Sequence, residues 1–194
     1  MSSNAVADEP VRKLVLALGF LALAGSALVA HRSPATGYEL SIYTMTPSWV
    51  WGGLSVALTV SLVVAFDRSG PAGGYTRPLA LVLGALAVVV VAGLPIVRGY
   101  HFFGQQDALT HLGWARGISG GSISPFDLLY PGIHTVAVFI NSLVGIPLAN
   151  ALLLVVLVAT VAFVVFVPLS VGLIVPDSLA VTIATFGAFL LLPI

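Results

Sequence analysis

Long runs of apolar residues, separated by short polar segments, dominate this chain of 194 residues. An α-helix needs about 20 residues to cross the hydrocarbon core of a bilayer, and each run is close to this length. The pattern therefore predicts six spanning helices. The runs cover residues 14–30, 49–66, 79–97, 131–146, 148–169 and 179–194. No internal repeat divides them. We therefore expect one all-α domain over residues 1–194, a polytopic transmembrane helical bundle of about six spans.

The first and the last runs each raise a question of processing or length. Arg12 and Lys13 precede the first run and small residues lie near its end, as in a cleaved signal peptide. Because the apolar run continues past that point, an uncleaved helix is favoured and cleavage stays open. The last run ends at FLLLPI without a polar flank, although spans usually close with interfacial or charged residues. This predicts that the sequence is incomplete at its C-terminus.

Composition supports a multi-pass protein of the cell membrane. Hydrophobic residues make up 59% of the chain, charged residues 7%, and the mean hydropathy is +1.11. The formal net charge is zero, so no basic surface indicates binding to nucleic acid. Four of the seven basic residues lie on the side of the N-terminus. This small excess predicts a cytoplasmic N-terminus and places the loop 98–130 outside.

The loop 98–130 interrupts the apolar pattern and concentrates the ionisable residues. Its segment DALTHLGWARGI, residues 107–118, places apolar residues on one side of a short predicted helix, with Asp107 and His111 one turn apart. We expect an amphipathic helix at the membrane surface. A break rich in glycine and serine follows, before Pro131 opens the fourth run.

Asp107 is the candidate catalytic residue, because a carboxylate can accept a proton from an attacking hydroxyl or bind a hard divalent cation through oxygen. A simpler interpretation is a helix N-cap whose carboxylate accepts backbone N–H groups. A divalent cation is a conceivable cofactor, with Asp107 its ligand, but two histidines and one acid define no ligand geometry. Candidate substrate-binding residues, with groups suited to a phosphate or sugar, are Arg98, His111, Arg116, Tyr130 and His134.

The order of these features resembles the N-terminal part of the GT-C glycosyltransferases. The residues that carry the resemblance are Gly121, Pro125 and the YPGIH of residues 130–134, together with YELSIYTMTPSWVW at residues 38–51. They are most similar to an uncharacterised branch of these enzymes common in haloarchaea, and the resemblance covers roughly residues 79–170. It implies a membrane enzyme that takes its sugar from a polyprenyl-phosphate donor.

In this family the first outward loop carries an acid important for catalysis, and Asp107 is the matching position. Many members have a second acid directly beside the first, whereas here Ala108 follows. Two other functions stay open. A non-catalytic membrane protein or truncated gene product would fit the abrupt C-terminus, whereas a transporter component is less favoured because the spans hold almost no ionisable residues.

Overall fold

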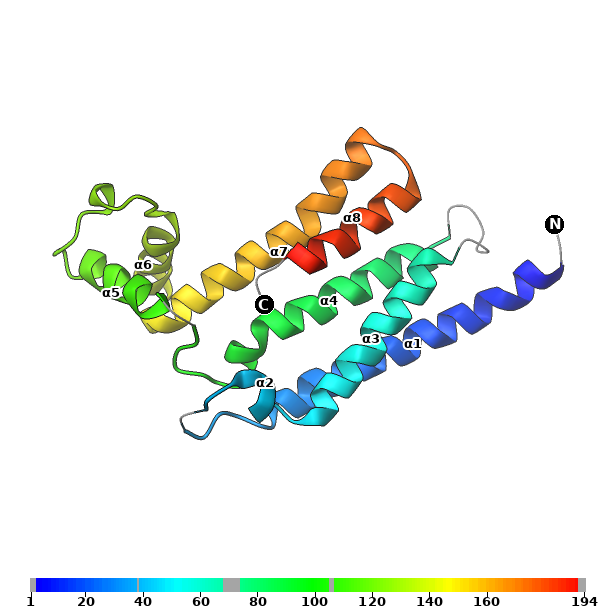
Figure 1. Ribbon diagram of the computed structural model, residues 1–194, viewed down its shortest axis with the longest axis horizontal. Helices are drawn as coiled ribbons and strands as arrows, with labels where there is room; N and C mark the ends of the chain where they lie inside the picture. The colour runs from blue at the N-terminus through cyan, green and yellow to red at the C-terminus, as the bar shows by residue number, and fades with distance from the viewer. Residues whose placement is uncertain (1–2, 38, 68–73, 105–106, 192–194) are drawn as a thin grey trace.

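The computed structural model describes residues 3–37, 39–67, 74–104 and 107–191, and its regular structure over these ranges is helical, as the sequence predicts (Figure 1). The helices are α1 (Ser3–His31), α2 (Ile42–Met45), α3 (Ser48–Phe66), α4 (Thr76–Val97), α5 (Ala108–Ser119), the 3-10 helix η1 (Pro125–Asp127), α6 (Gly132–Val144), α7 (Leu148–Ile174) and α8 (Ser178–Leu191).

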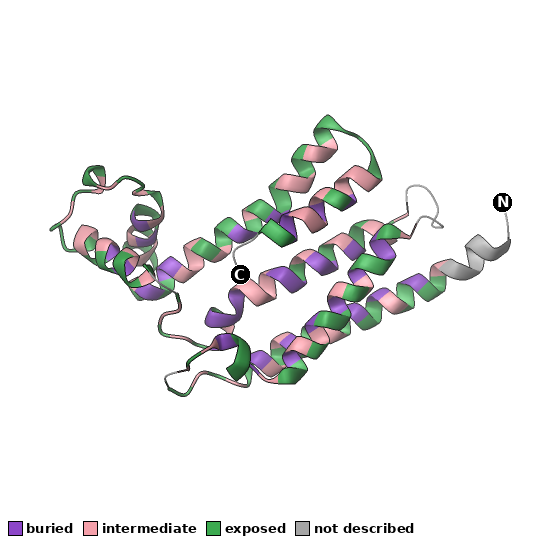
Figure 2. Cartoon of the chain, in the orientation of Figure 1, coloured by how far each residue is buried: buried purple, intermediate pink, exposed green. Residues whose placement is uncertain are grey.

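Helices α1, α3 and α4 form a three-helix bundle that contains most of the buried residues (Figure 2). Small residues let the helices approach closely, as is usual between membrane helices. Gly53 of α3 lies against Ala22 and Ser26 of α1. The Ser61 hydroxyl of α3 donates a hydrogen bond of 2.6 Å to the Ala80 carbonyl of α4. Packing of small residues and one buried polar contact therefore join the three helices.

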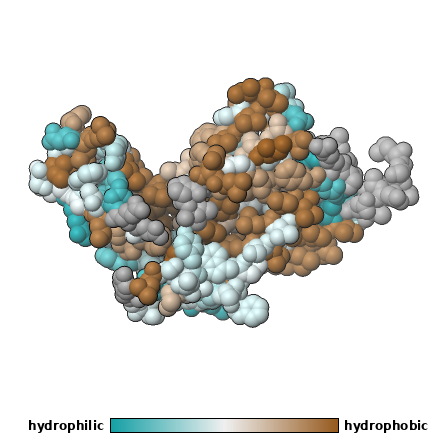
Figure 3. Space-filling model, viewed as in Figure 1, coloured by the Kyte–Doolittle hydropathy of each residue, from teal (hydrophilic) through white to brown (hydrophobic). Residues whose placement is uncertain are grey.

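Helix α7 packs antiparallel to α4, and α8 folds back along α7 and contacts α4 (Figure 1). Many large apolar side chains of α7 are exposed and the helix contains no charged residue, as expected of a helix that faces lipid. Figure 3 shows apolar residues over much of the bundle surface. The protein is thus a helical membrane protein.

Four helices among the described residues are long and apolar enough to cross a membrane, namely α1 from residue 9, α3, α4 and α7. The runs at 131–146 and 179–194 instead form the shorter helices α6 and α8, of 13 and 14 residues. At 1.5 Å per residue these are about 20 Å long, less than the about 30 Å of a hydrocarbon core. Residues 192–194 of the last predicted run lie outside the described residues.

One end of the bundle, which we call the loop end, carries the loop before α2 and the residues that follow α4. The predicted amphipathic helix is confirmed as α5, which pairs with α6 at this end, beyond the end of α4 (Figure 1). Leu112 and Ala115 of α5 pack on Ala137 of α6 and on the first turns of α7. This α5–α6 unit positions the candidate site.

Candidate functional site

Asp107 and His111 form a carboxylate–imidazole pair at the start of α5. Asp107 occupies the N-cap position, and its backbone carbonyl accepts the His111 N–H. Its carboxylate caps no backbone group and instead lies 3.2 Å from Nε2 of His111. The interpretation of this side chain as a capping carboxylate is therefore wrong. The Asp107 side chain is 70% exposed, so one face of the carboxylate stays accessible.

His134 of α6 extends this pair into the interior. Its Nε2 lies 2.9 Å from Nδ1 of His111, and the two rings stack with centroids 5.1 Å apart. His134 is fully buried, and its Nδ1 has no hydrogen-bond partner among the described residues. His111 thus lies between the other two side chains, with Nε2 near the carboxylate and Nδ1 at hydrogen-bond distance from His134. The three side chains form one continuous polar chain that ends at the carboxylate.

Two aromatic residues flank the histidines. Trp114 of α5 makes edge contacts with both imidazoles, each with centroids 5.4 Å apart. The Tyr130 ring lies 6.2 Å from the His111 ring and is half exposed. These rings fix the orientation of the imidazoles and leave Asp107 and Tyr130 facing the surroundings.

The two candidate arginines lie elsewhere. Arg116 is exposed on α5 and makes no ion pair within the described part of the chain. Arg98 is buried and forms a bidentate ion pair with Glu39, with both N–O distances 2.8 Å. Its Nε donates to the Ser33 carbonyl, and Nη1, which also binds Glu39, donates to the hydroxyls of Thr46 and Tyr100. All three guanidinium nitrogens of Arg98 thus donate within the protein, and a phosphate would have to displace one or more of these contacts.

The Glu39–Arg98 pair also perturbs the residues around it. The Arg98 hydrogen bonds hold the pKa of Glu39 below its usual value of 4.5, against the effect of burial. The Tyr100 hydroxyl donates to the same carboxylate. Burial, and then this hydrogen bond, raise the pKa of Tyr100 to about 12. This cluster ties the loop before α2 to the end of α4.

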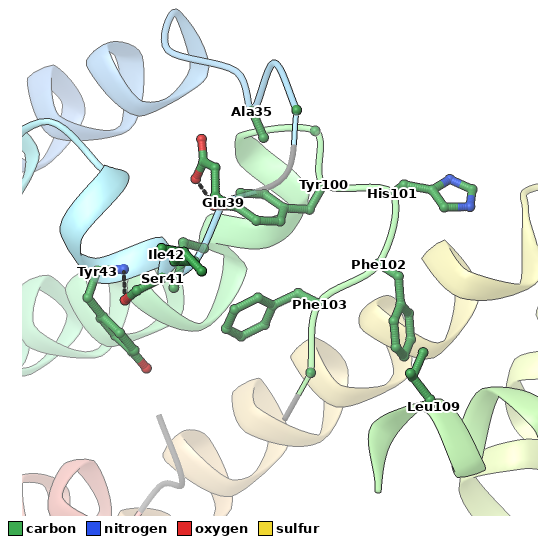
Figure 4. Close-up of a pocket in the computed structure, with 14 residues that line it drawn as sticks. Ala35, Glu39, Ser41, Ile42, Tyr43, Tyr100, His101, Phe102, Phe103 and Leu109 are labelled. Carbon is green, nitrogen blue, oxygen red and sulfur yellow. Dashed lines mark hydrogen bonds between the residues drawn. The ribbon is translucent and has the colours of Figure 1, made fainter. Parts of the chain in front are cut away.

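A cavity of about 630 Å³ lies beside this cluster, lined by residues 35, 37, 39–43, 99–104 and Leu109 (Figure 4). Phe103 points across it toward Ile42, whereas His101 points away from Glu39 and Tyr100 (Figure 4). A second cavity, of about 280 Å³, lies between α4 and α7 and is mostly apolar. The two share Ile42, Tyr43, Phe103 and Gly104 in their walls, so they adjoin. Ala108, directly after Asp107, lines the second cavity.

The described residues contain no group of three His, Cys, Asp or Glu side chains that could hold a metal ion. Asp107 and His134 lie on opposite nitrogens of His111, so the three do not converge on one point. A cation at Asp107 would therefore need further ligands from a substrate or from water.

The structure brings together four of the six candidate residues, Asp107, His111, Tyr130 and His134, and places Arg98 and Arg116 apart from them. Sequence reasoning missed Glu39 and Tyr100. The signal available in the sequence for Glu39 was that it is the only charged residue in the segment 33–48.

No protein-family model matches this chain, and comparisons with curated proteins and with solved structures find no match. Fold and site together therefore define a helical membrane protein with a polar cluster at the loop end.

Proposed function

We propose that the protein is a membrane glycosyltransferase that uses a polyprenyl-phosphate-linked sugar donor, with Asp107 as the general base. The observation that carries the proposal is the accessible carboxylate of Asp107, which lies beside His111 and directly precedes Ala108 in the wall of the smaller cavity. A base must be held in position and must still reach its substrate. Asp107 meets both conditions.

The two adjoining cavities support a ligand with a polar head and an apolar tail. The larger one is lined by loop residues with hydroxyl and backbone groups, and the smaller one by apolar side chains between two membrane helices. A lipid-linked sugar has this division, with its phosphate at the membrane surface and its chain in the hydrocarbon.

In the proposed reaction an acceptor hydroxyl gives its proton to the free oxygen of Asp107. A bond forms between the acceptor oxygen and the sugar C1, and the bond from C1 to the phosphate oxygen breaks, so that the lipid phosphate leaves with the electron pair. Nε2 of His111, 3.2 Å from the carboxylate, holds it beside α5. Because Arg98 is occupied, Arg116 and the Tyr130 hydroxyl are the candidates for contact with the phosphate.

The test is sugar transfer in membranes that contain the protein, from a pool of polyprenyl-phosphate sugars. We expect Asp107→Asn to lower the rate about 100- to 10,000-fold, the usual contribution of a general base. Asp127→Asn is the matched control, since this aspartate lies in the same loop outside the chain of Asp107, His111 and His134. Equal rates for both variants would remove Asp107 from the chemistry. Absence of transfer by the unaltered protein would overturn the proposed activity.

A further inference from the structure

Helix α6 begins and ends at the loop end of the molecule. Its first residues lie beside α5, because His134 contacts His111. Its last residues lie at the same end, because a cavity there is lined both by Ile96 and Tyr100, at the end of α4, and by Ile146, directly before α7. The opposite end of the α4–α7 pair is marked by a groove in which Pro78–Ala85 face Val164–Leu173. The chain therefore reaches α7 without leaving the loop end.

The surface of α6 is nevertheless that of a helix in contact with lipid. Val136, Phe139 and Leu143 follow the i, i+3, i+7 spacing of one face and are 47%, 63% and 71% exposed. The opposite face, with His134 and Ala137, is buried. The helix contains no acidic or basic residue besides His134. A helix face in water normally carries charges, and this one carries none.

The depth of α6 is set by its attachment to α7. Gly145, with φ +75°, ends α6 in the left-handed conformation that glycine adopts at low cost. The Asn141 side chain donates a hydrogen bond of 2.7 Å to the Ile146 carbonyl and closes the link to α7. Helix α7 has 27 residues, about 40 Å, which exceeds the about 30 Å of the hydrocarbon core. Its first turns, on which α6 packs, therefore fall near the boundary of hydrocarbon and headgroups.

We propose that α6 lies in the lipid leaflet at the loop end without crossing the bilayer, with Val136, Phe139 and Leu143 in contact with acyl chains, and that α7 is the fourth crossing. The occupant of this apolar face is lipid, because the face belongs to a charge-free helix held at the depth of that leaflet. The proposal replaces the crossing expected at residues 131–146 and does not depend on the proposed enzymatic activity.

The chain lacks cysteine, so single cysteines can carry a spin label without further changes. We would label V136C, F139C and L143C in liposomes and measure depth from the relative accessibility to oxygen and to a water-soluble nickel complex. V158C and V165C of α7 form the matched control, because these residues are also exposed and seven positions apart. Along a crossing helix, seven residues correspond to about 10 Å of depth.

We expect the three labels of α6 to lie at one depth within a few ångströms, near the headgroup boundary, while the two labels of α7 differ by about 10 Å. A depth that changes along α6 as it does along α7 would show a crossing helix and overturn the proposal. High accessibility to the nickel complex at all three positions would place the face in water and also overturn it. Strong spin–spin broadening that disappears on dilution with unlabelled protein would assign the face to a second copy instead.

Discussion

The ion pair of Arg98 and Glu39 shows what a buried charge does at the edge of this membrane protein. Both side chains are more than nine-tenths buried, and Arg98 donates to three other groups besides the carboxylate. Such a pair adds little net stability compared with apolar residues, but removal of one partner leaves an uncompensated charge. Its role here is to fix the loop before α2 against the end of α4, which together form the wall of the larger cavity.

Glu39→Gln should therefore destabilise the protein by about 3–5 kcal/mol, the usual cost of breaking a buried pair. Thermal unfolding in detergent measures this. Glu9→Gln is the control, because Glu9 also forms an ion pair, with Lys13, but on the surface. It should leave the melting temperature nearly unchanged. A similar small effect of both variants would contradict the structural role of Glu39.

The same pair predicts a dependence of stability on pH. The pKa of Glu39 is lowered on folding, so the carboxylate stabilises the folded state above its unfolded pKa of 4.5, and this contribution is lost as the pH falls through the lower folded pKa. The melting temperature of the unaltered protein should fall in that acidic range. The fall should be smaller in Glu39→Gln. An identical dependence of the melting temperature on acidic pH in both proteins would contradict the role of Glu39.

The contact between neighbours along a helix was predictable, and the pairing of Glu39 with Arg98 was not. Asp107 and His111 are four positions apart on a predicted helix, so their contact follows from helical geometry. Glu39 and Arg98 are 59 positions apart, and their pairing depends on how the bundle places two loops. Arg98 was therefore expected to bind substrate, because its partner could not be identified from the sequence.

At the scale of the helices, close packing depends on a few glycines. A Cβ on Gly53 would meet the Ala22 carbonyl at 2.9 Å and would also collide with the Ser26 hydroxyl. Gly52, its neighbour in α3, has open space around the same position. These adjacent residues allow a controlled test of the contact between α1 and α3.

Gly53→Ala should separate α1 from α3 and lower the melting temperature, at a cost of about 1–3 kcal/mol that is typical of overpacking. Gly52→Ala should leave stability unchanged or slightly increased, because alanine favours the helix more than glycine does. Thermal unfolding of the two variants side by side measures the difference. Equal melting temperatures would show that α1 and α3 do not meet at Gly53.

Helix positions followed from the apolar runs, whereas helix lengths did not. All six runs contain helices, and the predicted amphipathic helix is α5. The run at 131–146 yields only 13 helical residues because Pro131 precedes the first turn and Gly145 ends the last. Hydropathy reports that a helix faces lipid, but it does not distinguish a helix that crosses the bilayer from one that lies in a leaflet.

Within the described residues, α7 joins the three-helix bundle, against which α8 also packs through Val88, Val164 and Phe189, to the α5–α6 unit. The three-helix bundle has its own buried cluster, centred on residues such as Leu83 of α4. The α5–α6 unit has another, built from Leu112, Ala115 and Ala137 on the first turns of α7. Helices α5 and α6 make their main contacts with each other and with α7. Units connected in this way can open separately, at different free energies.

Hydrogen exchange in lipid nanodiscs should therefore show earlier exchange in α5 and α6 than in the middle of α4. Leu112→Ala removes packing worth about 2–5 kcal/mol from the small cluster and should speed exchange in α5 and α6 while leaving α1, α3 and α4 unchanged. Leu83→Ala removes a similar side chain from the bundle and should speed exchange in α1, α3 and α4.

A lost contact raises the exchange rate throughout the unit that opens with it. Faster exchange across all helices in Leu112→Ala would therefore mean that the α5–α6 unit and the bundle unfold as one body. Confinement of each effect to its own unit would mean that the candidate site can reorganise around Asp107 while the bundle stays folded.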